Sequence, residues 1–249
     1  MASSLHQRSG AQARSAPPAG PPAASTAEAD VDPYVYRPRL RGAIHHYAVF
    51  VALAVGILLV VDAQTAKARW GCIVYACSTV AMFGTSATYH RADWGPKGRV
   101  VMRRLDHAAI FLLIAGTNTP LALLALTPAH SFRLLCLVWG GAFAGIAQCL
   151  FFSRAPKVLA ASLYVALGWA VLPFARQYKE SLEDLDVALI VAGGIIYSVG
   201  ALVYAAKRPD PAPAVFGYHE IFHVFVTLAA ALHFVAVYRI VNSPLGAAH

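Results

Sequence analysis

The stretch Tyr218-His219-Glu220-Ile221-Phe222-His223 decides how the rest of this sequence is interpreted. Two histidines four residues apart lie on one face of a helix, with Cβ atoms about 5–6 Å apart, so both can reach one metal ion. An apolar run over 224–232 follows directly, which places the pair at the rim of a predicted bilayer span. Ionisable groups at membrane depth are costly and indicate a functional site.

The composition around this stretch is that of a membrane protein. Of 249 residues, 58% are hydrophobic and 13% are charged, and the mean hydropathy is +0.57. Soluble domains are about 25% charged, so we predict a polytopic integral membrane protein. Its fold is predicted to be all-α, a bundle of seven transmembrane helices. The predicted spans are 43–61, 70–90, 104–126, 132–152, 158–174, 187–206 and 215–240.

Residues 1–36 differ from the membrane domain predicted over 37–249. Ser, Ala, Pro and Gly dominate them, as in the run 15–22. Such a segment cannot bury enough apolar surface to offset the entropy lost on ordering. We therefore expect a disordered cytoplasmic tail.

Lys and Arg side chains predict the orientation, because cytoplasmic loops carry an excess of them. With the N-terminus in the cytoplasm, twelve of these residues in 37–249 flank the inner ends of the spans and six flank the outer ends. We predict a cytoplasmic N-terminus and an outside C-terminus in the cell (plasma) membrane, which the composition suggests is a bacterial inner membrane. The net charge of +8 does not indicate nucleic-acid binding, since the basic residues lie in short loops. We predict no soluble partner.

Hydropathy and charge place several polar residues at one level. His90 ends the second span, Asp106 begins the third, and His219 and His223 begin the seventh. Catalytic zinc takes three protein ligands and a water, so we predict a zinc site formed by His90, His219 and His223. Asp106 is the predicted base for the water. Ser86, four residues before His90, is predicted to hydrogen-bond the same water.

Plainer interpretations remain open. His90 can be an interfacial residue, and Asp106 can pair with Arg103 or Arg104. We interpret Glu220 as a solvated charge facing the cytoplasm. Structural roles are the better interpretation for His45, His46, His107 and His233. The polar run 116–120, which ends at Pro120, indicates a helix kink. The run could line a cavity, but packing is the better interpretation.

The motifs resemble those of the haemolysin III family, which is related to the progestin and adipoQ receptors, including the adiponectin receptors. The matching blocks are Arg37–His45 (RPRLRGAIH), Ser86–His90 (SATYH), Leu105–Pro120 (LDHAAIFLLIAGTNTP), Ile196–Gly200 (IYSVG) and Gly217–His223 (GYHEIFH). This resemblance implies a seven-helix bundle with a cytoplasmic N-terminus and a zinc site at the cytoplasmic side. It implies that His90, His219 and His223 are the zinc ligands and that Asp106 and Ser86 hold a water. In the receptor relatives this arrangement has been likened to the active site of membrane ceramidases.

The leading functional hypothesis is a zinc hydrolase that acts on an amide or ester bond of a membrane lipid. An intramembrane protease with Glu220 as its base ranks lower, because 224–249 contains no Asp or Glu to complete the ligand set. A regulator or sensor with structural zinc, and a cytolytic protein as the family label suggests, are the alternatives that are not enzymes.

Overall fold

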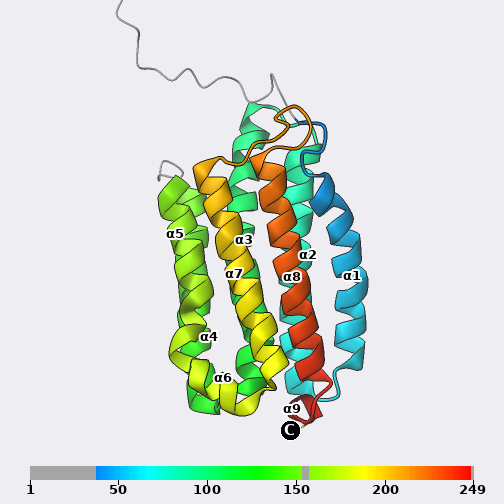
Figure 1. Ribbon diagram of the computed structural model, residues 1–249, viewed down its shortest axis with the longest axis vertical. Helices are drawn as coiled ribbons and strands as arrows, with labels where there is room; N and C mark the ends of the chain where they lie inside the picture. The colour runs from blue at the N-terminus through cyan, green and yellow to red at the C-terminus, as the bar shows by residue number, and fades with distance from the viewer. Residues whose placement is uncertain (1–37, 153–156, 248–249) are drawn as a thin grey trace, which may run out of the picture. The chain divides into compact units, whose positions relative to one another are not determined.

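The computed structural model describes residues 38–152 and 157–247, which form a bundle of helices (Figure 1). The elements are α1 (Ala43–Asp62), α2 (Ala66–Arg91), α3 (Pro96–Ala125), α4 (Pro128–Phe151), α5 (Lys157–Gly168), the 3-10 helix η1 (Trp169–Phe174), α6 (Ala175–Ser181), α7 (Asp184–Ala206), α8 (Tyr218–Val241) and α9 (Pro244–Ala247). Within the described ranges the β contacts amount to one isolated bridge, between Ala212 and Phe216. The predicted all-α fold is confirmed. The tail predicted over 1–36 lies outside the described residues.

Six helices are long and apolar enough to cross a membrane, namely α1, α2, α3, α4, α7 and α8. A helix rises about 1.5 Å per residue, so even α1, with 20 residues, matches the thickness of a bilayer core. Large apolar side chains point away from the bundle, among them Phe50, Phe143 and Leu202, which are 61%, 64% and 68% exposed. A surface of this kind is suited to lipid rather than water. The chain is therefore a polytopic membrane protein.

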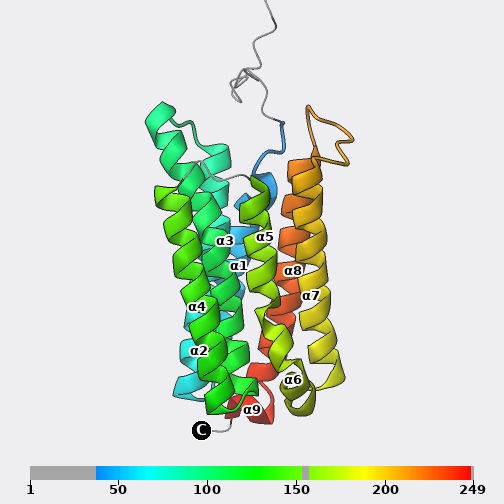
Figure 2. The same cartoon turned by 90° about the vertical axis from the view of Figure 1, so that its left-hand side faces the viewer.

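The seventh crossing is the segment α5–η1–α6, which runs from one end of the bundle to the other (Figure 2). The sequence predicts a single short span here, over 158–174. In the structure the α-helix ends at Gly168, continues as a 3-10 helix that contains Pro173, and resumes as α6. Proline has no N–H to donate to the helical ladder, which explains the interruption at this point.

α3 is the most enclosed spanning helix, with 78% of its most apolar window buried against 11% for α7. Thr117, Asn118 and Thr119 each donate a side-chain hydrogen bond of 2.8 Å to the carbonyl four residues earlier. These bonds satisfy polar groups inside the bundle just before Pro120. The run packs as predicted, and Thr117 and Asn118 also border a cavity.

The chain enters and leaves the bundle at opposite ends. α1 begins at the end that carries the α2–α3 and α7–α8 connections, and α9 lies at the other end (Figure 1). α3 extends beyond the predicted span because it begins at Pro96, a residue favoured at the first position of a helix. The polar residues predicted to form a site all come from the first of these two ends, which we call the histidine end.

Candidate metal centre

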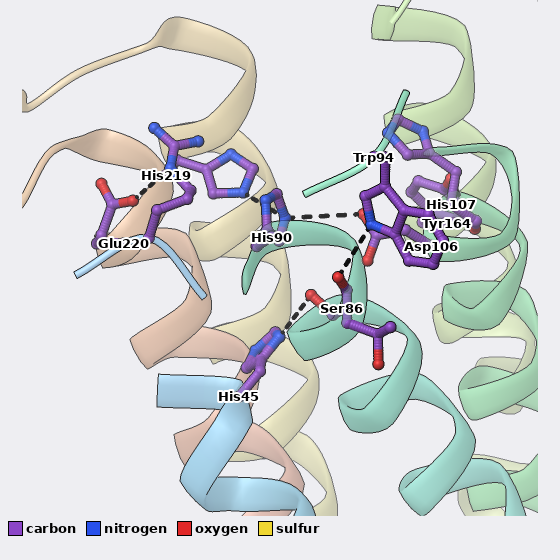
Figure 3. A network of polar contacts seen from close by, with 11 residues as sticks. His45, Ser86, His90, Trp94, Asp106, His107, Tyr164, His219 and Glu220 are labelled. Atoms are coloured by element: carbon purple, nitrogen blue, oxygen red, sulfur yellow. Dashed lines mark hydrogen bonds and ion pairs between the residues drawn. The ribbon is translucent and has the colours of Figure 1, made fainter. Parts of the chain in front are cut away.

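Four helices bring polar side chains together at the histidine end (Figure 3). His90 lies in the last turn of α2 and Asp106 in the N-terminal part of α3, while His219 and His223 lie in the first two turns of α8. α1 contributes His45 from its first turn. Residues far apart in the sequence therefore share one small volume at the rim of the bundle.

The three histidines predicted as ligands form a compact group. One ring nitrogen of each lies within 4.8 Å of the others, and His90 Nε2 is 3.2 Å from His219 Nε2. The His223 residue is 2% exposed and the His90 side chain 8%. Burying several polar rings together is costly unless they share a partner. The structure thus brings together the residues that the sequence singled out.

Zinc fits this donor set. Zinc–nitrogen bonds of about 2.0–2.1 Å in tetrahedral geometry place two nitrogen ligands about 3.3 Å apart, close to the 3.2 Å between His90 and His219. Among the described residues, the group of mutually close donors contains these three histidines alone. Three protein ligands leave the fourth tetrahedral position open, as in catalytic zinc sites. That these residues bind zinc stays a prediction.

Asp106 lies beside the three histidines and also contacts Ser86. Its Oδ2 is 3.9 Å from His90 Nε2, and its carboxylate forms a side-chain hydrogen bond with Ser86. Ser86 is buried and also bonds His45 Nδ1 at 2.9 Å. The structure places the Ser86 hydroxyl between Asp106 and His45. That Ser86 holds a water together with Asp106 stays a prediction.

His45 packs directly against a candidate ligand. Its ring stacks on that of His223, with centroids 3.9 Å apart and planes at 6°. His45 was predicted to have a structural role, and in the structure it lies against His223 and Ser86. Neighbours that fix a ligand's orientation strongly affect metal affinity. No spacing within the sequence links residue 45 to residue 223.

Gly42 allows α1 to approach the end of α2. It has a φ of +73°, and a Cβ at this position would lie 2.5 Å from the Cβ of His90. Glycine adopts this left-handed conformation without the steric cost that other residues meet. The close approach positions the first turn of α1, and with it His45, against Ser86.

The interpretation of Glu220 as a solvated charge is wrong, because the residue is 1% exposed. Its Oε1 lies 2.7 Å from Arg41 Nε, and its Oε2 accepts a 2.9 Å hydrogen bond from the backbone N–H of Gly217. A buried carboxylate needs a cation or donors of this kind. Two backbone hydrogen bonds from 39–40 to 214–215 hold the segment that carries Arg41 in place.

The other residues named as candidates or alternatives make the following contacts. Arg104, one of the alternative partners considered for Asp106, donates to the carbonyl of Leu150 at 2.9 Å. His46 is exposed. His233 bonds the carbonyl of Ile190 at 3.1 Å, ten residues along α8 from His223. The carbonyl of His107 accepts a hydrogen bond from Tyr164.

A helical bundle with seven crossings, and with clustered imidazoles and a carboxylate at one end, defines a polytopic membrane protein with a candidate metal centre. Residues 34–234 match the family described as Haemolysin-III related. This match covers most of the chain, so the protein belongs to the haemolysin-III related family, as the motif resemblance predicted.

Three relatives show the breadth of this family. Hemolysin-3 of Bacillus cereus is 32% identical over 197 residues, which cover 78% of this chain and 86% of that protein. The Hemolysin-3 homolog of Bacillus subtilis (strain 168) is 28% identical over 204 residues, covering 80% and 92%. The heptahelical transmembrane protein ADIPOR2 of Oryza sativa subsp. japonica is 30% identical over 190 residues, covering 70% and 83%. The predicted relationship to adiponectin receptors is therefore confirmed as well.

Proposed function

We propose that this protein is a zinc-dependent hydrolase that cleaves an amide or ester bond of a membrane lipid. One observation carries the proposal, the convergence of three imidazole donors with a single carboxylate. His90, His219 and His223 offer nitrogens within 4.8 Å of one another, and Asp106 lies 3.9 Å from His90. Three histidine ligands with an adjacent base are typical of hydrolytic zinc sites.

Each residue has a defined role in this proposal. His90, His219 and His223 hold the metal. Zinc, when bound, polarises a carbonyl and lowers the pKa of a water ligand to about 7. Asp106 accepts a proton from the attacking water and returns it to the departing amine or alcohol. Ser86 orients Asp106 through its hydrogen bond.

The location of the site supports a lipid as substrate. The three histidines lie on α2 and α8, two of the helices that qualify as membrane spans, and near the ends of those helices. A substrate must therefore bring its reacting bond to the rim of the hydrocarbon region. The linkage between the headgroup and the chains of a lipid lies at this depth already, whereas a water-soluble substrate would first lose its hydration.

The position of Glu220 favours Asp106 as the base. Both carboxylate oxygens of Glu220 are engaged, one by Arg41 and the other by Gly217. A general base needs a lone pair within reach of the proton that it removes. The protease hypothesis, which requires Glu220 as base, is therefore the weaker one.

A regulator with structural zinc is the second candidate. The observation that favours it is that one metal held by His90, His219 and His223 would join α2 to α8, which lie far apart in the sequence. A metal that bridges distant elements contributes its binding free energy to folding. This candidate predicts zinc-dependent stability without turnover.

The deciding experiment combines metal content with lipid hydrolysis. Wild-type protein purified in detergent should hold about one zinc per chain by mass spectrometry and should hydrolyse a fluorescent N-acyl sphingoid lipid or a fluorescent ester lipid. His219→Ala should lose both properties, whereas His46→Ala, at an exposed position, should keep both. Asp106→Asn should retain zinc and lower kcat by about 10²–10⁴-fold, with a smaller effect from Glu220→Gln.

The possible outcomes separate the candidates. Zinc-free wild type, or equal hydrolysis by wild type and His219→Ala, would refute the hydrolase. One bound zinc with no hydrolysis of either lipid would favour the regulator. Dye release from liposomes by the wild type alone would favour cytolysis.

A further inference from the structure

Positive charge is concentrated at the histidine end of the bundle. Among the described residues, this end carries ten Lys and Arg against four Asp and Glu, whereas the opposite end carries six against five. Glu220 is already paired with Arg41. Asp210 accepts a hydrogen bond from the backbone N–H of Tyr218 at the start of α8. The histidine end therefore has more positive charge than its described carboxylates can neutralise.

Six of these basic side chains are exposed and form a surface that we call the basic rim, namely Arg39, Arg91, Lys97, Arg103, Lys207 and Arg208. None of the six has an ion-pair partner among the residues that the structure describes. They come from the segment before α1, the end of α2, the start of α3 and the α7–α8 connection. These parts of the fold also supply or adjoin the residues of the candidate metal centre.

Two arginines of the basic rim lie at the depth of lipid headgroups. Arg91 directly follows His90 at the end of α2, and Arg103 lies three residues before Asp106 on α3. At 1.5 Å per residue, both lie within about 5 Å, measured along their helices, of the polar residues at the rim of the bilayer core. The headgroup layer extends about 5–7 Å beyond that core. Trp94, in the connection between α2 and α3, is a residue type enriched at this interface.

The start of α3 also exposes apolar side chains among its basic ones. Val100, Val101 and Leu105 are 40%, 53% and 40% exposed. The α2–α3 connection reaches beyond the ends of α4 and α5, so these helices leave it uncovered (Figure 2). A surface that combines basic and apolar side chains suits the boundary between headgroups and acyl chains better than an acidic partner in water. The membrane itself is therefore the best match for the basic rim.

We propose that the basic rim binds the headgroups of anionic phospholipids in the leaflet around the histidine end, with Arg91 and Arg103 holding phosphate groups beside the candidate metal centre. A guanidinium group is always charged and offers two parallel N–H groups to a phosphate. Basic clusters directly next to a membrane span attract anionic lipids. The binding requires neither a metal nor hydrolysis, because it involves none of the histidines.

Native mass spectrometry of the full chain in detergent tests this proposal, with an equimolar mixture of phosphatidylglycerol and phosphatidylcholine that share the same acyl chains. Wild-type protein should bind phosphatidylglycerol on the order of tenfold more tightly at low ionic strength. In 1 M ammonium acetate, where charges are screened over about 3 Å, this preference should fall to about twofold.

Two double variants locate the binding surface. Arg91→Gln combined with Arg103→Gln should reduce the preference at low ionic strength to about threefold or less. The matched control combines Arg133→Gln with Lys179→Gln. It removes the same charge from exposed positions at the opposite end of the bundle and should keep the full preference.

Equal binding of the two phospholipids by wild type would overturn the proposal and leave membrane orientation as the role of the excess charge. A preference that survives in Arg91→Gln/Arg103→Gln, is lost equally in the control, or does not fall with salt would overturn it too. His219→Ala should keep the preference, and its loss in that variant would place the phospholipid on the metal instead. The hydrolase can therefore be refuted without affecting this proposal, and the reverse also holds.

Discussion

Two contacts of different kinds hold the His45 ring behind the candidate ligand His223. The ring stacks on His223 at 3.9 Å, and its Nδ1 is bonded to Ser86 at 2.9 Å. Ser86 in turn interacts with Asp106. One residue of α1 is therefore connected both to a proposed ligand and, through one hydroxyl, to the proposed base.

Replacing His45 with Ala should weaken zinc binding by about 10–100-fold, because His223 would lose the neighbour that orients it. His46→Ala removes the adjacent imidazole from an exposed position and should leave the affinity unchanged. Titration of purified protein against a chelator of known zinc affinity measures both values. An unchanged affinity in His45→Ala would show that His223 needs no support from α1.

Glu220 is the second residue whose role depends on a distant partner. Replacing it with Ala should lower the free energy of unfolding by about 2–4 kcal/mol, because Arg41 and the N–H of Gly217 would lose a buried partner. The matched control is Glu180→Ala. Glu180 pairs with Arg176 at 2.8 Å, but the two side chains are 59% and 92% exposed, so the loss should be below about 0.5 kcal/mol.

Unfolding of both variants in mixed micelles with increasing dodecyl sulfate provides the comparison. Similar losses in Glu220→Ala and Glu180→Ala would contradict a buried, stabilising role for the pair of Glu220 with Arg41.

Part of this arrangement can be predicted from the sequence. Helical spacing places His219 and His223 on one face, and the ends of the apolar spans place His90 and Asp106 at the same level. Partners across distant segments cannot be predicted in this way. Arg41 meets Glu220 and His45 meets His223 because the segment before α1 packs against the α7–α8 connection, which no local pattern encodes.

Helices α2 and α3 pack closely because a glycine faces a serine. A Cβ at Gly116 would overlap the Ser78 hydroxyl, which donates a hydrogen bond to the carbonyl of Tyr75. Small residues of this kind let helix backbones approach inside a membrane, where dispersion contacts and hydrogen bonds replace the hydrophobic driving force. The contact lies in the most enclosed helix of the bundle.

Gly116→Ala should destabilise the protein by about 1–3 kcal/mol, since an extra methyl group at a tight contact forces the helices apart. Gly140→Ala should not destabilise it, because nothing lies within 4 Å of a Cβ at that position on α4, and alanine favours the helix by up to about 1 kcal/mol. Thermal unfolding of both variants in one detergent measures the difference. A Gly116→Ala protein as stable as Gly140→Ala would contradict this prediction.

The elements that the sequence predicts least well are those with weak or interrupted hydropathy. The span over 158–174 appears short because the crossing continues past Pro173 into α6, where Arg176, Lys179 and Glu180 lower the apolar signal. Hydropathy also does not predict the first turns of α3 as part of a span, since four of the eight residues in 97–104 are Lys or Arg. In both places the helical backbone extends beyond the apolar stretch.

At the scale of the whole molecule, the two ends of the bundle differ in their polar chemistry. The histidine end holds the imidazole cluster and the pair of Arg41 with Glu220. At the opposite end Arg239 pairs with Asp186 and Glu183, which joins the end of α8 to the start of α7. The spanning helices place these ends on opposite sides of the membrane, so the candidate metal centre lies nearer to one side.

The basic residues predict which side this is. Among the described residues, ten Lys and Arg residues flank the histidine end and six flank the other, so the histidine end should face the cytoplasm and the C-terminus should lie outside. Single cysteines test this in a variant without the four native ones. Gln64→Cys in the α1–α2 connection should react with a membrane-impermeant maleimide in intact cells, whereas Pro211→Cys in the α7–α8 connection should react only after lysis. Both positions are exposed, so access to the reagent does not bias the comparison. The reverse pattern would show the opposite orientation, in which the candidate metal centre faces the outside and its lipid substrate comes from the outer leaflet.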